Sequence, residues 1–588
     1  MAIPLTHFSA VLMALALSIV PATGMAQATG EGARLKAIYS AEWTWRGAQQ
    51  ADSEETERGG IPDRLADVGP AAQKQRLEYW LKVRAKLQAI DQTALSPRER
   101  DDYIVYKTQI DALIDGQVFR DYEKPLNSDS AFWSDLAYGA SGSFRTETDY
   151  RNYIKQLNDV PRYFDQNIDN MRAGLKRGFT PPKVTLTGRE ASIARVADAQ
   201  PRDTVYFKPF LTLPSGFSDS LKADLQAQAE AAIATRVIPA HQKLLTFMVA
   251  DYIPKARTGL AATGLPDGKA YYQAQIRAYT TLDLSPDEIH AIGLREVAKI
   301  RADMQTIMTE VGFKGSLGDF LTFLRTDPQF YAQTPQDLLY RAAWVSKRFD
   351  AKAGDYFGRL PRQRFGIYPV APEIAPFYTS GRGGPGAYWV NTYDLKSRPL
   401  YSLPALTLHE SAPGHAFQMP LSLENKDLAD FRQRTYISAY GEGWALYAEY
   451  LGLEMGIYET PYERFGYLSY QMWRAARLVV DTGIHAKGWT REQAQAFMRD
   501  NTALSEHELT TEVDRYITWP GQALSYYLGY LTIKEARQRA ETALGDRFDI
   551  RAFHDTILDL GSVPLPLVTA RVERFITDGG KGPYAKGD

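Results

Sequence analysis

Helical periodicity runs through most of this chain and constrains its fold more than any other feature. In the segment 70–90, PAAQKQRLEYWLKVRAKLQAI, the apolar residues Leu77, Trp80, Leu81 and Leu87 recur at helical spacing. Similar patterns follow along most of the sequence, and no fixed-period repeat or low-complexity tract interrupts them. The sequence therefore predicts a mainly α-helical protein.

Two helical segments begin with the same start signal. Ser96 followed by Pro97 predicts an N-cap and a first helical position, and Gly116 is the expected stop of that helix. The pair Ser285-Pro286 repeats the signal and predicts a helix that continues to about Val311.

The amino-acid composition changes between residues 356 and 403, which are rich in proline and glycine. The segment 387–393, AYWVNTY, has the composition of a short strand. We expect a small β-sheet here, beside the helices that resume after Ser402. Such a strand could pair with an extended peptide, or it could be an ordinary edge strand next to a flexible loop. Within it, Asn391 is a candidate substrate-binding residue.

Length and charge limit the possible classes of protein. A chain of 588 residues is long enough for one large domain or several packed subdomains. We place a boundary near Leu265, between a helical subdomain at 29–265 and a catalytic helical subdomain at 266–588.

The charge balance limits the possible partners. With 68 basic and 70 acidic side chains, and no long run of Lys or Arg, neither nucleic acid nor an anionic membrane is an expected partner.

The first 28 residues resemble a signal peptide. The apolar run from Phe8 to Val20 is too short to span a bilayer but suits a signal-peptide core, and small residues allow cleavage after Ala26 or Ala28. The segment before the run lacks Lys and Arg, which departs from the usual pattern. The sequence contains no cysteine, so we expect no disulfide, no lipid anchor and no thiolate metal site. The expected product is an exported, soluble protein, periplasmic in a Gram-negative cell.

The segment HESAPGH, at 409–415, is the first candidate metal motif. A catalytic zinc site without cysteine needs three His or carboxylate ligands and an open position, and His409 and His415 are the closest pair among eight histidines. On an unbroken helix their directions would differ by about 120°. Pro413 and Gly414 permit a break or bulge that would turn His415 back towards His409. The alternative is a chance cluster.

A second candidate segment is AYGEGWALYAEYLG, at 439–452. Glu442 and Glu449 are seven residues apart, so both project from one face of a helix. One could bind a metal ion while the other orients a ligand. The alternative is a helix with solvated acids, which the apolar neighbours Trp444 and Leu446 disfavour.

Several motifs together resemble a known family. HESAPGHAFQ, GEGWALYAEYL, RAARLVVDTGIHAKGWTREQA, EVDRYITWPGQALSYYLG and SPDEIHAIGLREV resemble the bacterial family called domain of unknown function 885, from about residue 35 to the C-terminus. That family is similar to gluzincin metallopeptidases such as thimet oligopeptidase, carboxypeptidase Taq and angiotensin-converting enzyme. The resemblance implies a helical fold with a deep cleft, and one zinc ion held by His409, His415 and Glu442, with Glu410 as the catalytic base. The longer gap between the two histidines departs from those relatives.

The same resemblance implies a late tyrosine that donates to the developing oxyanion. Within YITWPGQALSYYLGY it corresponds to Tyr526, with Tyr530 one turn further along. Packed aromatic side chains are the alternative for both. His485 and His507 are further candidates, for orienting a ligand or contacting substrate, although a lone histidine is more often structural or exposed.

Three arginines could hold a substrate carboxylate. Arg474, Arg477 and Arg515 lie in the motifs quoted above, and each could equally pair with an acid on a helix.

These features predict an exported zinc metallopeptidase that hydrolyses oligopeptides with a metal-activated water and Glu410 as general base. A zinc hydrolase of a non-peptide amide, such as a modified amino acid or a cell-wall fragment, is the first alternative. A peptide-binding protein without catalysis is the second, and the intact His-Glu pair argues against it. The sequence gives no indication of endo- or exo-cleavage, of side-chain preference or of oligomeric state.

Overall fold

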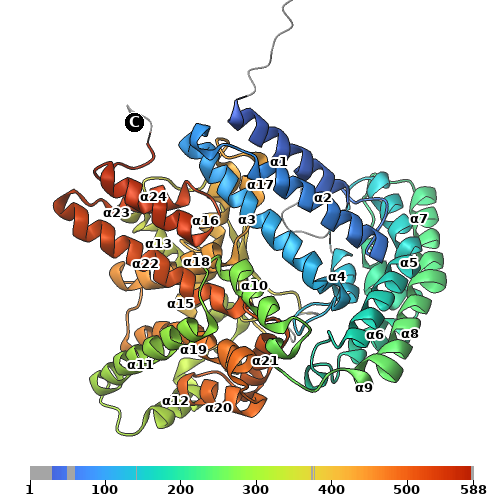
Figure 1. Cartoon of the computed structure of the whole chain (residues 1–588). Coiled ribbons are helices and arrows are strands. Elements are labelled where there is room, and N and C mark those ends of the chain that lie inside the picture. The colour runs from blue at the N-terminus through green and yellow to red at the C-terminus, as the bar shows by residue number, and fades with distance from the viewer. Residues whose placement is uncertain are drawn as a thin grey trace, which may run out of the picture.

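The computed structural model describes residues 30–49, 60–140, 142, 144–372, 375 and 378–584, and within them helices predominate (Figure 1). The prediction of a mainly α-helical protein with a small sheet is confirmed. The predicted signal peptide lies outside the described residues. Among the residues described, no helix is both long and apolar enough to cross a membrane.

The helices of the first part of the chain are α1 (Glu31–Ala48), α2 (Pro70–Gln88), α3 (Pro97–Phe119), α4 (Phe132–Gly139), α5 (Glu147–Arg177), α6 (Glu190–Ala197), α7 (Asp219–Ala232), α8 (Ile238–Phe247) and α9 (Ile253–Lys255). Those that follow are α10 (Gly268–Thr280), α11 (Pro286–Glu310), α12 (Leu317–Thr326), α13 (Pro335–Asp350) and α14 (Ala353–Tyr356).

After the sheet, the remaining helices are α15 (Leu403–Glu410), α16 (His415–Glu424), α17 (Asp430–Arg434), α18 (Ser438–Glu454), α19 (Pro461–Lys487), α20 (Arg491–Asn501), α21 (Glu506–Thr518), α22 (Ser525–Leu544), α23 (Ile550–Leu558) and α24 (Leu565–Thr577).

The predicted start signals form capping boxes. Ser96 accepts a hydrogen bond from the N3 backbone at the start of α3, and Ser285 does the same at the start of α11, so both starts are confirmed. Helix α11 ends within one residue of the predicted end. The predicted stop at Gly116 is wrong. Helix α3 passes through this glycine to Phe119, and Arg120 ends it in the left-handed conformation (φ 60°).

Two large hydrophobic cores organise the helices, and a third, smaller cluster packs α13 against β3 (Ala387–Val390). One core combines α1–α3 with the helices from α10 onwards, and the other is formed by residues of 126–256. In Figure 1, α5 to α9 gather on one side while α1 to α3 run from them towards the C-terminal helices. Helices α1–α3 therefore share the core of the C-terminal part although they precede Leu265. The division near Leu265 stays a prediction.

Helices α18 and α22 cross with their backbones in direct contact at two glycines. A Cβ built on Gly529 would lie 1.9 Å from the carbonyl oxygen of Ala439 and 2.8 Å from the Cα of Gly443. A Cβ on Gly443 would lie 2.5 Å from the Cα of Gly529. This close approach is possible only without side chains at both positions.

The sheet has the strand order β1-β3-β2, formed by β1 (Gly366–Pro369), β2 (Gly381–Gly384) and β3 (Ala387–Val390). Strand β3 pairs in parallel with β1 and antiparallel with β2, which leaves β2 at an edge beside α15 and α16. Strand β3 is shorter than the predicted segment 387–393. Asn391 follows it, and its side-chain amide donates to the backbone carbonyls of Ala375, Tyr378 and Thr379.

Candidate metal centre

The helix that carries the first histidine breaks inside the HESAPGH segment. Helix α15 ends at Glu410 and α16 begins at His415. Between them the N–H of Gly414 donates back to the carbonyl of Leu408 (3.0 Å). A Cβ on Gly414 would lie 1.8 Å from the carbonyl oxygen of His409, so the chain doubles back more tightly than a side chain allows. From α18, the indole N–H of Trp444 donates to the carbonyl of Pro413 (2.8 Å) and holds the turn.

This turn brings two imidazoles and one carboxylate together. Glu442 Oε2 lies 3.3 Å from His409 Nε2 and 3.4 Å from His415 Nε2. The three possible ligand atoms lie within 4.8 Å of one another, and the two imidazole planes meet at 86°. Ligand atoms placed tetrahedrally at zinc bond lengths are separated by roughly 3.3–3.5 Å. The spacing of this His-His-Glu cluster therefore fits a metal ion.

The hydrogen bonding of His409 points to the same conclusion. Its Nδ1 lies 2.8 Å from Oε1 of the fully buried Glu449. Because a carboxylate accepts hydrogen bonds, Nδ1 donates to it and Nε2 is the ring nitrogen that faces the cluster. Glu442 Oε2 is also buried and, among the described residues, receives no well-directed hydrogen bond. Two ring nitrogens and a carboxylate oxygen that converge in this way suit a shared cation, and this is the arrangement a metal-ligating histidine with an orienting carboxylate adopts.

The electrostatics of the cluster favour positive charge. Burial opposes protonation of His409, but the nearby carboxylates of Glu442, Glu449 and Glu410 raise the pKa of its imidazole to about 9. Burial also opposes ionisation of Glu442, yet the two imidazoles hold its pKa well below the ordinary range. A divalent cation at this position would replace the proton in both roles.

Glu410 is held beside the cluster by the sheet. Its Oε2 accepts a hydrogen bond from the backbone N–H of Gly383 in β2 (2.7 Å). A Cβ on Gly383 would lie 1.7 Å from the carbonyl oxygen of Glu410. Only glycine lets β2 approach α15 this closely, and the short strand thereby fixes the candidate base.

Replacing Gly383 with alanine is expected to separate β2 from α15 and to destabilise the protein by roughly 1–3 kcal/mol, the usual cost of overpacking. The matched control is Gly384→Ala, because a Cβ there meets nothing within 4 Å. We expect the control to change stability by about 0.5 kcal/mol or less. Thermal unfolding of the two variants measures the difference, and equal melting temperatures would contradict the close approach.

Tyr436 is a site residue that the sequence patterns missed. Its hydroxyl donates to Glu442 Oε1 (3.1 Å), the oxygen that does not face the imidazoles. Burial and the charge of Glu442 raise the pKa of Tyr436 well above its ordinary value, so it stays a donor. The ring lies against Gly441, where a Cβ would come within 2.5 Å of it. No spacing rule links a tyrosine that precedes a helix to a ligand in the second turn of that helix, although the glycine beside the ligand, Gly441, makes room for the contact.

The tyrosines proposed as oxyanion donors are bound to other groups. The Tyr526 hydroxyl lies 3.3 Å from Arg515 Nη2 and 3.5 Å from Gln522 Nε2. The Tyr530 hydroxyl accepts from Lys534 Nζ (3.0 Å). Neither makes a hydrogen bond to the His-His-Glu cluster within the described residues.

The remaining candidates occupy structural or exposed positions. His485 is buried, accepts the N–H of Ala262 at Nδ1 (3.0 Å) and donates to the carbonyl of Tyr516 from Nε2 (2.8 Å). Burial lowers its pKa to about 3, so it is neutral and both nitrogens are used by backbone groups. Asn391 likewise binds backbone carbonyls, and His507 is exposed at the start of α21.

Comparison with known proteins identifies the family. The family model described as "Bacterial protein of unknown function (DUF885)" matches residues 53–572. The chain belongs to this family. Among solved structures, this DUF885 member is similar to a candidate lipoprotein from Colwellia psychrerythraea, with 27% identity, a TM-score of 0.86 and coverage of 93% of this chain and 100% of that chain.

A second similar structure, a candidate lipoprotein of unknown function from Shewanella oneidensis, has 18% identity and a TM-score of 0.66. It covers 92% of the DUF885 chain and 99% of its own, and at this identity it shows a shared fold. Comparison with curated proteins gave no match.

Proposed function

We propose that this DUF885 protein is a zinc-dependent hydrolase that cleaves peptide bonds of oligopeptides. The observation that carries the proposal is the convergence of His409, His415 and Glu442 beside an anchored carboxylate, Glu410. Two imidazoles and one carboxylate, with no cysteine in the chain, suit zinc among the common metal ions. When bound, such an ion supplies Lewis acidity that polarises a substrate carbonyl and makes water more nucleophilic.

Residues of the chain would transfer the proton and orient the metal ligands. Glu410 accepts a proton from the attacking water at its carboxylate and delivers it to the leaving amine, while the N–H of Gly383 keeps that carboxylate in place. Glu449 fixes the tautomer and ring orientation of His409. Tyr436 fixes the rotamer of Glu442 through its second oxygen.

Resemblance to gluzincin peptidases favours a peptide as substrate and supports this choice of reaction. We further propose that the protein is exported and acts in the periplasm. The apolar segment Phe8–Val20 supports export, as does the similarity to the candidate lipoprotein from Colwellia psychrerythraea.

The deciding experiment is peptide hydrolysis with and without metal. Purified protein should contain about one zinc per chain and cleave members of a mixed peptide library, as judged by mass spectrometry. A chelator should abolish cleavage and added zinc should restore it, because three protein ligands and an open position need the ion. Cleavage that survives complete removal of metal, or a metal-loaded protein that cleaves no member of the library, would overturn the proposal.

A further inference from the structure

A buried arginine on α19 lacks a counter-ion. The side chain of Arg474 is 5% exposed, and its Nε and Nη1 atoms are buried without a hydrogen-bond partner. Within the described parts of the chain its guanidinium makes no hydrogen bond or ion pair. Its contacts are with aromatic faces, 4.4 Å from the ring centroid of Tyr470 and 4.3 Å from that of Trp473. A buried charge without an anion is costly, so a ligand that supplies one would be bound favourably.

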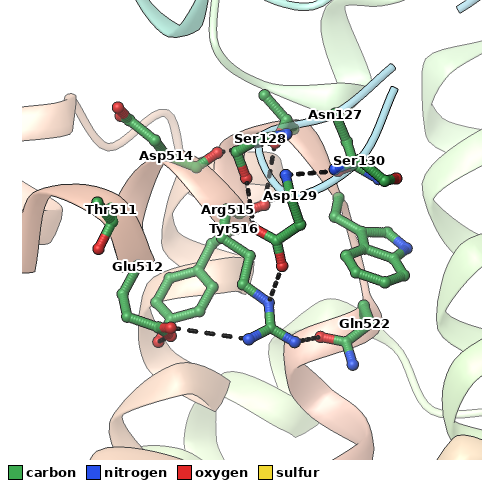
Figure 2. Close-up of polar contacts among 12 residues, drawn as sticks. Asn127, Ser128, Asp129, Ser130, Thr511, Glu512, Asp514, Arg515, Tyr516 and Gln522 are labelled. Atoms are coloured by element: carbon green, nitrogen blue, oxygen red, sulfur yellow. Dashed lines mark hydrogen bonds and ion pairs between the residues drawn. The ribbon is translucent and has the colours of Figure 1, made fainter. Parts of the chain in front are cut away.

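The two neighbouring arginines differ from it because the protein itself neutralises them. Arg477 pairs with Glu512 (2.9 Å). Arg515 contacts Asp129 (3.3 Å), Glu512 (3.7 Å) and Gln522 (3.0 Å), as Figure 2 shows. Each of the three arginines keeps at least one buried nitrogen without a hydrogen bond, but among the described residues only Arg474 has no carboxylate paired with it.

Helix α19, which carries Arg474, packs against α15 and α18, the helices that bear His409, Glu442 and Glu449. Tyr470 lies one turn before Arg474 on the same face. Burial raises the pKa of Tyr470, and although Arg474 opposes this, the charges of Glu449, Glu508 and Glu410 add to it. Tyr470 is therefore within electrostatic reach of the candidate base, and its ring contacts the Arg474 guanidinium.

A second polar group without a partner lies beside this arginine. Gln471 is 2% exposed, and both its amide oxygen and its amide nitrogen are buried without a hydrogen-bond partner. It is three residues before Arg474 on α19, so the two side chains are neighbours on the helix surface. The amide nitrogen adds a donor, and its oxygen an acceptor, next to the guanidinium fork.

We propose that Arg474, with Gln471, binds the carboxylate of the substrate, so that the site acts on peptides cleaved close to a free C-terminus. The guanidinium offers two parallel N–H donors that match a carboxylate, and the surrounding low dielectric strengthens the pair. This inference rests on the proposed hydrolase function and specifies its substrate class. An internal peptide segment brings no anion to Arg474 and would leave its charge unpaired.

The test compares one blocked peptide that ends in a free carboxylate with the same peptide as its C-terminal amide. We expect wild type to show a kcat/KM about 10- to 100-fold higher for the acid, the range for a charge-assisted bidentate pair. In Arg474→Gln this acid-to-amide ratio should fall close to one, mainly through KM, and in Arg474→Lys it should be intermediate because charge is kept without the fork. Arg464→Gln is the control, an exposed arginine of α19 paired with Glu310.

Binding is measured in parallel by calorimetry on Glu410→Gln protein loaded with zinc, with and without Arg474→Gln. Zinc content and circular dichroism confirm that each variant is folded. Equal kcat/KM for acid and amide in wild type, or an unchanged ratio in folded Arg474→Gln and Arg474→Lys, would overturn the inference. If wild type cleaves neither peptide but binds the acid more tightly, and Arg474→Gln removes that preference, the carboxylate site stands and the hydrolase proposal fails. If no preference is found in either assay, the carboxylate site is refuted.

Discussion

Replacing Glu410 with glutamine should slow peptide hydrolysis by at least ~10²-fold while the zinc content stays near one per chain. Glutamine keeps the length of the side chain, and its amide oxygen can still accept the hydrogen bond from Gly383. It cannot take a proton from water at neutral pH, so the loss should appear in kcat. Steady-state kinetics on one peptide, together with elemental analysis, measure both quantities.

Glu449→Gln is the informative comparison for this variant. Glu449 binds His409 Nδ1 and is fully buried, so its replacement should weaken zinc binding by roughly 10- to 100-fold, as loss of an outer partner does. At saturating zinc it should retain more activity than Glu410→Gln. Unchanged turnover in Glu410→Gln would exclude this residue as the base and make Glu449 the next candidate.

The second large effect is expected on metal content. His415→Ala should reduce zinc affinity by more than the roughly 10- to 100-fold that an outer partner contributes, and hydrolysis should fall with it. The variant isolates the loss of the ligand, because His415 Nδ1 has no hydrogen-bond partner among the described residues and its removal leaves no backbone group unpaired. Metal titration and circular dichroism should therefore show lost zinc binding with intact helices.

Glu442→Gln tests the carboxylate ligand in the same way. Its amide oxygen can keep the hydrogen bond from Tyr436, so the local packing is preserved while the negative charge is removed. The exposed His507, changed to alanine, is the control for a histidine remote from the His-His-Glu cluster. Full zinc content in both His415→Ala and Glu442→Gln would show that the ligand set is wrong.

Much of the fold could be predicted because its signals are local. The Ser-Pro starts of α3 and α11 depend on hydrogen bonds within a few residues of the cap, and both form as predicted. The predicted helix end at Gly116 was wrong because a glycine weakens a helix interior without ending the helix when the turns on either side are packed in the core. Strand β3 ended early because Asn391 binds the backbone of a segment some twelve or more residues before it, which no local pattern records.

In the candidate site, too, features set by local spacing could be predicted, and contacts between separate elements could not. Spacing alone predicted that Glu442 and Glu449 share a helix face, and the structure places both against His409. The contacts of Gly383 with Glu410 and of Tyr436 with Glu442 depend on how separate elements pack, so they were missed. For His485 the residue type suggested chemistry, but the fold uses both ring nitrogens to bind backbone groups. The sequence likewise does not reveal which arginine has a counter-ion, because that depends on how α19 packs against α21.

The backbone contact between Gly443 and Gly529 limits how this site can change over evolution. Helix α18 bears Glu442 and Glu449, and α22 bears the two late tyrosines. No side chain lies between the two helices at this crossing, so neither a change of rotamer nor a change of residue size can adjust the distance between them. Variation in substrate among family members should therefore arise where β2 and α19 pack against the helices that bear the metal ligands, while α18 and α22 keep an invariant spacing.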